Sequence, residues 1–323
     1  MATLLDKKCP ACGGRIACLM ALVAVLGSRP GAAYHLAPLD IALKSSSCVI
    51  VGSTIDVADA GRREIALRAA PAAAPLAPAQ LTAVTLNLWH DQHDWPARRT
   101  VIVDTLRVLG PDVIFLQEVL EKEGLPNQAQ QLADSLGYAF VFASVDPVGG
   151  PKRYGNAILA RHAITASHEV KLPPLTDWRV AAHARLLLPD GRYLDAYATH
   201  LHHTDEGAAI RAEQVAGLLA FIDDTRSGAA ALVIGGDFNA EPDRRELAPL
   251  FARFTDALAA VDPRAAVTAA TFGPATGTPP RRIDYLFSEP AGLTVEAARV
   301  ILGAPTAAGV WGSDHCGVWA RFE

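Results

Sequence analysis

The sequence predicts an α/β fold in which two packed, mixed β-sheets carry helices on their outer faces. Nine short segments after residue 80 are rich in β-branched and aromatic residues and are bounded by Gly, Pro or Asp, as strands are. Between them lie stretches in which apolar residues recur with the helical period. Since nine strands are more than one strongly twisted sheet comfortably holds, we expect two sheets.

The expected elements follow in chain order. The nine strands are Ala83–Leu88, Val113–Gln117, Ala139–Ala143, Asn156–Ala160, Ala181–Leu188, Leu194–Thr199, Leu232–Gly235, Ile283–Ser288 and Gly317–Phe322. One helix is expected where Ile102, Leu106 and Leu109 recur at helical spacing, and a second around 215–222. Pro189-Asp190-Gly191 is typical of a tight turn and predicts a hairpin.

Composition and charge narrow the possible functions. Half of the 323 residues are hydrophobic, which is enough to build a full core and excludes wholesale disorder. The formal net charge is -5, and no lysine-rich run or basic tail is present. A protein that holds duplex DNA by broad phosphate neutralisation should be more basic. No apolar stretch reaches the roughly 20 residues that span a bilayer, so we expect no stable membrane span.

The chain divides near residue 80, where Ala69–Gln80 form an Ala/Pro tract typical of a semi-rigid linker. The 80 residues up to its end contain 8 Lys and Arg against 5 Asp and Glu, whereas the rest contains 21 against 29. We therefore expect three parts: residues 1–33, an uncharacterised segment with its linker at 34–80, and one domain at 81–323.

Residues 1–33 allow three interpretations. Basic residues precede an apolar run at 16–26, and small residues follow, which resembles a secretory signal peptide. Alternatively, Cys9-Pro-Ala-Cys12 is one knuckle of a zinc site, although Cys18 and Cys48 are not spaced as the second. The third interpretation is an unstructured extension. If the signal peptide is real, the protein is exported; otherwise it is cytoplasmic.

The segment before the linker carries little chemistry. Val49–Val57 is apolar enough to form a strand. Five cysteines, an odd number scattered mostly near the N-terminus, do not make a disulfide framework.

Polar side chains in the domain gather at the ends of the expected strands, which is where α/β folds place their sites. Each alone is explained by capping or a turn, but together they exceed what capping requires. Carboxylates and amides without thiolates suit Mg²⁺ or Mn²⁺. The residues are Asn87, Glu118, His200, Asp237, Asn239, Asp284, Asp314 and His315.

These patches, in this order, resemble the endonuclease/exonuclease/phosphatase superfamily, the DNase I-like metallophosphoesterases. The resemblance runs from LTAVTLNLW at 81–89, through LQE at 116–118, DFN at 237–239 and RIDYLF at 282–287, to SDHCGVWARF at 313–322. It implies a four-layer α/β/β/α sandwich. It also implies a monomeric hydrolase of phosphodiesters that uses a divalent metal.

The resemblance assigns metal binding to three residues and the phosphate chemistry to five. Glu118 would be the main metal ligand, with Asn87 beside it and Asp314 as a further carboxylate. The others would activate water, hold phosphate oxygens or protonate the leaving group. They are Asp237 as the base, Asn239 on a phosphate oxygen, His315 oriented by Asp284, and His200 on phosphate or the leaving oxygen.

For several nearby residues, the sequence allows either a role in substrate binding or a structural role. Asn156 follows Gly155, which we expect to allow either close backbone approach or a turn, and Asn156 either contacts substrate or holds the loop. Arg179 either clamps a phosphate or forms a surface ion pair. His202 shares a face with His200 and either binds a second metal or packs. Arg211 with Gln214 either buttress the His200 strand or face solvent, and Arg281-Arg282 could attract an anion.

Three functions follow from the sequence. The first is a metal-dependent phosphodiesterase acting on a small molecule or lipid headgroup. The second is a DNase I-like nuclease acting on DNA or RNA, which the acidic domain with its three lysines makes less suited to duplex DNA. The third is a catalytically silent binding module of the same fold. The complete set of site residues argues against it, because an inactive protein would be expected to have lost some of them.

Overall fold

The computed structural model describes residues 41–44, 47–50, 53–54, 80–226 and 230–323. The chain forms two units, Met1–Pro75 and Leu76–Glu323. The signal-peptide and zinc-knuckle predictions lie outside the described residues. No helix among those residues is long and apolar enough to cross a membrane.

The first unit contains a small antiparallel sheet of three short strands, β1 (Ile41–Lys44), β2 (Ser47–Ile50) and β3 (Ser53–Thr54). The single strand predicted at Val49–Val57 is wrong in one respect. Val49 pairs with Thr54 and Ile50 with Ser53, so the chain turns back on itself between β2 and β3. Residues 55–57 lie outside the described part.

The second unit is built on two six-stranded mixed sheets. The first sheet has the order β14 (Val295–Ile301), β15 (Gly317–Phe322), β4 (Leu81–Asn87), β5 (Val113–Lys122), β7 (Lys152–Ala160) and β6 (Ala139–Ser144). The second has the order β12 (Thr255–Asp256), β13 (Asp284–Ser288), β11 (Ala230–Asp237), β10 (Tyr193–His200), β9 (Val180–Leu187) and β8 (Ala163–Lys171).

Each sheet is centred on one parallel pair joined by a helix. Helix α2 (Trp95–Leu109) connects β4 to β5, and α4 (Ala208–Thr225) connects β10 to β11. All other neighbouring strands in the two sheets are antiparallel. The two strands of a parallel pair end at the same edge of the sheet, so the residues at their carboxyl ends lie close together there.

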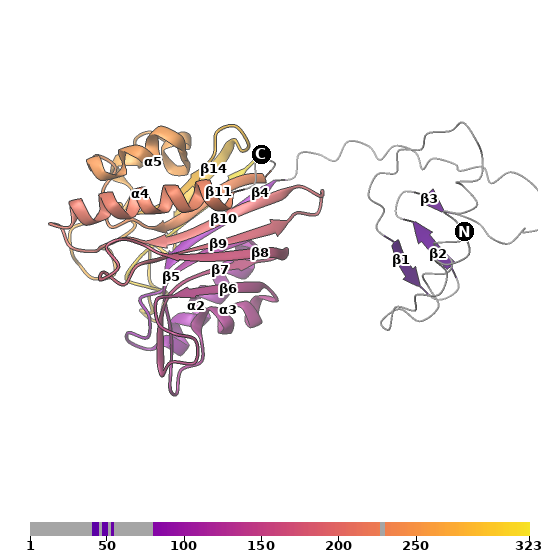
Figure 1. Ribbon diagram of the computed structural model, residues 1–323. Coiled ribbons are helices and arrows are strands. Elements are labelled where there is room, and N and C mark those ends of the chain that lie inside the picture. The colour runs from indigo at the N-terminus through magenta and orange to yellow at the C-terminus, as the bar shows by residue number, and fades with distance from the viewer. Residues whose placement is uncertain (1–40, 45–46, 51–52, 55–79, 227–229) are drawn as a thin grey trace, which may run out of the picture. The chain divides into compact units, whose positions relative to one another are not determined.

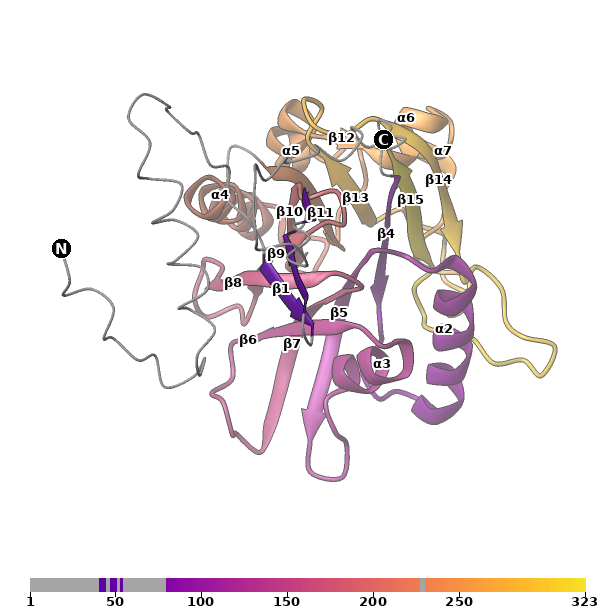
Figure 2. The ribbon, with the colours of Figure 1, turned by 90° about the vertical axis from the view of Figure 1, so that its right-hand side faces the viewer.

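Helices cover the outer face of each sheet, which gives four layers (Figures 1 and 2). Helix α2 and α3 (Gln128–Leu136) bury Ile102, Leu106 and Leu132 against the first sheet. Helix α4 and α5 (Ala248–Arg253) bury Leu218 and Leu250 against the second. Short helices η1 (Arg245–Leu247), α6 (Ala257–Val261) and α7 (Ala265–Thr268) complete the unit. The predicted sandwich is confirmed.

Many small residues line the layer between the two sheets. Ala182, Ala184, Ala196 and Ala198 from the second sheet are buried there with Phe115 and Val113 from the first, among others. A Cβ atom added at Gly235 on β11 would lie 2.3 Å from the ring of Phe115. The glycine therefore sets how closely the sheets approach at this point.

All nine predicted strands are present, whereas β8, β12 and β14 were not predicted. Each of the three lies at the edge of its sheet. An edge strand has neighbours on one side only and carries more exposed, charged residues, as in AITASHEVK and VEAARVI. Their sequences therefore lack the apolar signal that marks a central strand.

We expect Gly235→Ala to lower the free energy of unfolding by about 1–3 kcal/mol, because the added methyl forces the sheets apart. Urea unfolding measures this change. Gly292→Ala is the matched control, since its nearest neighbour, the Cα of Ala231, lies at an ordinary 3.6 Å. The double variant Gly235→Ala/Phe115→Leu, in which a smaller side chain faces the new methyl group, should regain part of the lost stability. If Gly235→Ala and Gly292→Ala destabilised the protein equally, the steric explanation would be refuted.

Candidate active site

The candidate site lies where the central strands of both sheets end. Asn87 is the last residue of β4, His200 of β10 and Asp237 of β11. Asp284 opens β13 and pairs with Asp237 across the sheet. The predicted residues Asp314 and His315 follow in the loop before β15. Residues far apart in the sequence thus share one edge of the sandwich.

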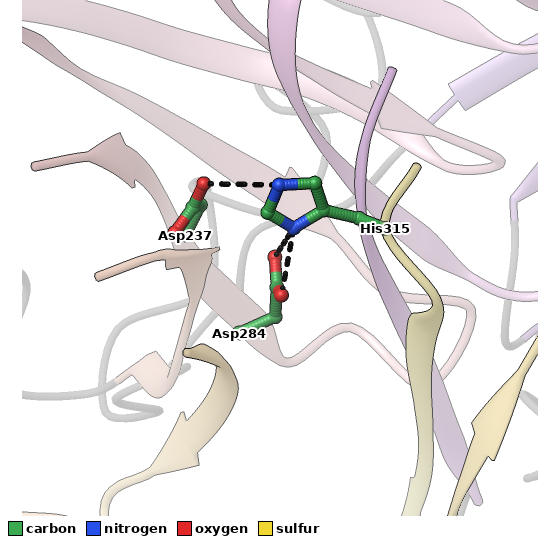
Figure 3. A group of neighbouring side chains, drawn as sticks. All are labelled: Asp237, Asp284 and His315. Atoms are coloured by element: carbon green, nitrogen blue, oxygen red, sulfur yellow. Dashed lines mark hydrogen bonds and ion pairs between the residues drawn. The ribbon is translucent and has the colours of Figure 1, made fainter. Parts of the chain in front are cut away.

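His315 sits between two aspartates (Figure 3). Its Nδ1 lies 2.9 Å from Oδ2 of Asp284, and its Nε2 lies 3.7 Å from Oδ2 of Asp237. All three side chains are buried, and one ligand atom from each lies within 4.8 Å of the others, as in a metal-binding group. The cluster carries one imidazole between two carboxylates.

Burial and mutual charge shift the pKa values of this cluster. Burial would lower the pKa of His315, but the two aspartates outweigh it and raise the pKa to about 10. Burial, reinforced by Asp284, raises the pKa of Asp237 to about 7. In the absence of metal, His315 is therefore a cation at neutral pH, and Asp237 is near its titration point.

Thr271 fixes Asp284 from the backbone side. Its hydroxyl accepts hydrogen bonds from the backbone N–H groups of Ile283 and Asp284 at 3.0 and 3.1 Å. Its carbonyl accepts from the N–H of Cys316 at 2.6 Å. One residue thus links the strand of Asp284 to the loop of His315. Thr271 was not predicted to belong to the site, because a single Thr outside any motif gives no signal.

Asn87 connects the two sheets through its side chain. Its Nδ2 donates to Oδ2 of Asp237 at 3.0 Å and to Oε1 of Glu118 at 3.2 Å, while its Oδ1 accepts from the N–H of Trp89. The amide therefore bridges the residue predicted as a base and the residue predicted as the main metal ligand.

Glu118 reaches the site because the backbone of β5 is irregular. The register of β5 against β7 shifts between Leu116 and Val119, and Glu118 adopts a φ of 55°, which is costly for a side chain other than glycine. Strain of this kind concentrates at functional positions. The carboxylate lies 3.9 Å from Nε2 of His90, and burial together with the charge of Glu118 raises the pKa of Tyr154.

Asp314 adds a second carboxylate on the side of Glu118. Ser313 holds it, since the Ser313 hydroxyl lies 3.2 Å from Oδ1 of Asp314 and 2.7 Å from the carbonyl oxygen of Asn87. Burial raises the pKa of Asp314; His315 opposes this shift, and Glu118 adds to it. Partly buried carboxylates such as Glu118 and Asp314 are ligands that suit a hard divalent cation.

His200 and Asn239 lie on the other side of Asp237. The Nε2 of His200 is 3.4 Å from Oδ2 of Asp237. Burial, with Arg179 and His315 nearby, holds the pKa of His200 well below its ordinary value. The Asn239 backbone, at a φ of 51°, donates to Oδ1 of Asp237, and its side chain donates to the Leu201 carbonyl. His200 is thus neutral where His315 is charged.

The two predicted substrate contacts differ in their surroundings. Asn156 is buried, and its Nδ2 donates to the carbonyl of Val180 at 2.8 Å, which supports the structural interpretation. A Cβ atom at neighbouring Gly155 would lie 1.9 Å from the carbonyl oxygen of Ala143, so its expected close approach is confirmed. Arg179 lies with Nε 3.9 Å from Oδ2 of Asp177 and Nη2 3.3 Å from Nδ1 of His203, so it takes part in an ion pair.

The remaining polar residues near the site are structural. His202 uses both ring nitrogens, on Asp177 at 2.7 Å and on Thr204 at 2.9 Å, which leaves none for a second metal. Arg211 is buried and, like Gln214, holds this segment, so both buttress the chain after His200. Of the arginine pair, Arg282 is buried against Asp256, and Arg281 pairs with Glu241.

Arg98 supports the site and was not predicted from the sequence. Its buried guanidinium donates to five backbone carbonyls, and so ties the loop after Asn87 to the loop before Asp314. They belong to Leu88, Trp89, His90, Gln92 and Gly312, at 2.6–3.3 Å. Burial lowers its pKa to about 10. Since all five partners are backbone atoms, no sequence motif marks this residue.

Several known proteins resemble this chain. A Caenorhabditis elegans protein named "Putative neutral sphingomyelinase" is 27% identical over 186 residues, which are 50% of this chain and 42% of that protein. The chain thus matches less than half the length of this relative.

Among solved structures, the D. rerio TDP2 humanized by 14 mutations has a TM-score of 0.62 and 21% identity, covering 76% of this chain and 99% of that one. The human Nocturnin catalytic domain has a TM-score of 0.62 and 21% identity, covering 76% and 94%. A mannosyl-6-phosphatase from Bacteroides thetaiotaomicron has a TM-score of 0.61 and 17% identity, covering 75% and 99%. At these identities the structures show a shared fold.

The family model described as "Endonuclease/Exonuclease/phosphatase family" matches residues 84–315, which contain every site residue discussed above. Members of this family are hydrolases that act on phosphoesters. The chain belongs to the endonuclease/exonuclease/phosphatase family.

Proposed function

We propose that this protein is a divalent-metal-dependent phosphodiesterase, which hydrolyses its substrate by in-line attack of water. The observation that carries the proposal is that two imidazoles converge on the base candidate Asp237: Nε2 of His200 lies 3.4 Å and Nε2 of His315 lies 3.7 Å from its Oδ2. A phosphate ester repels nucleophiles, so its hydrolysis needs donors on the phosphate and a base on the water.

The proposal places Mg²⁺ or Mn²⁺ at Glu118, Asn87 and Asp314. This half of the site gathers negative charge, whereas the Asp237–Asp284–His315 cluster already holds a cation in the protonated His315. A metal bound there would neutralise phosphate charge and favour ionisation of water. We therefore favour the Glu118 side, although it is the cluster that brings three ligand atoms within 4.8 Å of one another.

The protein's own residues supply the remaining steps. Asp237, with a pKa near 7, is poised to orient the attacking water and accept its proton. His315, held by Asp284, donates from Nε2 to a phosphate oxygen. Asn239 and His200 lie beside Asp237 and would bind the other phosphate or leaving oxygens. Arg179 adds positive charge at the mouth.

A substrate panel with Mg²⁺ tests the proposed function. Plasmid DNA, RNA, sphingomyelin, bis-p-nitrophenyl phosphate and a phosphomonoester separate nuclease, lipid diesterase and phosphatase activity. We expect diester hydrolysis that a chelator abolishes and Mg²⁺ or Mn²⁺ restores. Turnover of the monoester alone, or no turnover of any substrate, would contradict a phosphodiesterase; the latter would favour the silent binding module.

Two classes of substitution should separate metal binding from catalysis. We expect Asp237→Asn and His315→Ala to lower kcat by roughly 10²–10⁴-fold with metal affinity nearly unchanged, because each removes a proton-transfer or donor group. We expect Glu118→Gln to weaken Mn²⁺ binding at least about tenfold. Calorimetry measures the affinity. If His315→Ala, rather than Glu118→Gln, abolished Mn²⁺ binding, the metal would belong to the cluster.

The protonation of His315 can be measured directly. In metal-free protein its ring should stay protonated to about pH 10, since Asp284 and Asp237 stabilise the cation. In Asp284→Asn the titration should move down, because burial then acts with less opposition. NMR of the ring follows both titrations, with exposed His93 as the internal control. A wild-type His315 that titrates near 6.5 would remove the argument for a charged donor.

Arg98→Met should reduce activity through position rather than charge, because it frees five carbonyls on two site loops. We expect a loss of at least tenfold in kcat, a weaker Mn²⁺ affinity, and partial recovery with Arg98→Lys. Arg107→Met on the exposed face of α2 is the control. If Arg98→Met lowered stability but left kcat and Mn²⁺ affinity unchanged, the role of Arg98 would be purely structural.

A further inference from the structure

The loop that follows β4 carries an imidazole, His90, beside Glu118. The backbone has a φ of 56° at Trp89 and 31° at His90, a conformation that costs energy for side chains other than glycine. Two buried side chains hold it there, since Gln128 and Arg98 donate to the carbonyl of His90 at 2.7 and 2.6 Å. The fold therefore fixes the position of His90.

The two ring nitrogens of His90 face two different carboxylates. Nδ1 lies 3.1 Å from Oδ1 of Asp91, and Nε2 lies 3.9 Å from Oε2 of Glu118. Lys122 pairs with the other oxygen of Asp91, and Lys122 and His90 together lower the pKa of Asp91 to about 2. An ionised carboxylate only accepts hydrogen bonds, so Nδ1 carries the proton. In the neutral ring, the lone pair of Nε2 therefore faces Glu118.

The gap between Nε2 of His90 and Oε2 of Glu118 suits a shared ion. At 3.9 Å it is longer than an N–H···O hydrogen bond. Two atoms that each lie about 2.1 Å from one ion are at most about 4.2 Å apart. Nε2 has no hydrogen-bond partner in the described part of the chain. Two acceptors that face each other in this way can bind one cation between them.

The surroundings of His90 match those of a metal-bound histidine. Such a histidine usually donates its other ring N–H to a carboxylate, which fixes the orientation of the ring, and Asp91 occupies this position. The Tyr154 ring lies at an angle of 70° to the imidazole, with 6.2 Å between the ring centres. His90, Asp91 and Tyr154 line a hollow of about 620 Å³, which gives a hydrated ion access to the imidazole.

We propose that Nε2 of His90 is a ligand of the metal at Glu118, so that the site binds Mn²⁺ and Co²⁺ more tightly than Mg²⁺. This inference rests on the proposed function and adds a nitrogen ligand to the carboxylates of Glu118 and Asp314. Mg²⁺ is bound mainly through oxygen, whereas an imidazole favours first-row transition ions, and Co²⁺ over Mn²⁺. His90 would thus determine which ion the site selects.

Calorimetry on the full-length, metal-free protein tests the ion preference. We expect His90→Gln to weaken Co²⁺ binding at least about tenfold and to change Mg²⁺ binding little. The variant leaves the backbone carbonyl of residue 90 in place for Gln128 and Arg98. His93→Gln is the matched control, since it removes an exposed imidazole that contacts Trp89 in the same loop. Unchanged Co²⁺ affinity in His90→Gln would refute the ligand role.

Pulsed EPR of bound Mn²⁺ identifies the ligand directly. Wild-type protein and His93→Gln should show the modulation of a directly bound nitrogen, which His90→Gln should lack. Asp91→Ala should keep this signal but bind Co²⁺ more weakly, because the ring loses its orientation. A nitrogen signal that persisted in His90→Gln and disappeared in His315→Ala would place the ion in the Asp237–Asp284–His315 cluster and refute the inference.

Hydrolysis of bis-p-nitrophenyl phosphate separates this inference from the proposed function. If the protein hydrolysed the diester with Mn²⁺ but showed no nitrogen signal from His90, the ligand role alone would fail. If the signal from His90 were present and no diester were hydrolysed, the metal site would stand and the phosphodiesterase would not.

Discussion

The hydrogen bond between Asn87 and Asp237 joins the two sheets at the one place where chemistry is expected. Asn87 ends the parallel pair of the first sheet, and Asp237 ends that of the second. The same amide also holds Glu118, so the spacing between the two halves of the site depends on one side chain. A buried polar contact of this kind is stable only while every member is satisfied, and its geometry is correspondingly specific.

The site separates two kinds of charge across this hydrogen bond. On one side, an imidazolium lies between two aspartates and has its positive charge built in. On the other side, burial and the charge of Glu118 raise the pKa of Asp314, and the proposed metal would supply the positive charge there. Phosphoryl chemistry requires cationic character on both sides of the reacting phosphorus, and this division would supply it from two different sources.

Much of this arrangement was predictable from the sequence because the central strands are buried. Their apolar runs are distinctive, and each ends in a polar residue, so the polar residues could be expected to meet. Three of the four edge strands were not predictable in this way, because β8 and β14 are half exposed and carry charges and β12 has only two residues. Arg282 was misjudged for a related reason: a basic residue near a site suggests an anion, but this one is buried on Asp256.

The supporting residues escaped prediction for a different reason. Arg98 and Thr271 act on backbone atoms of segments distant in the sequence, which carry no side-chain signature. Local pattern shows which residues can do chemistry, whereas the identity of their supports depends on the folded chain.

The contact between Gly235 and the Phe115 ring also limits how the molecule can adapt. Because the backbone of Gly235 packs directly on the ring of Phe115, the two sheets are held in a fixed position and do not slide or spread when a larger molecule binds. Accommodation of substrates of different size must therefore come from the surface loops. New substrate preferences in this fold would then arise through changes in the surface loops, while the packing of the two sheets stays the same.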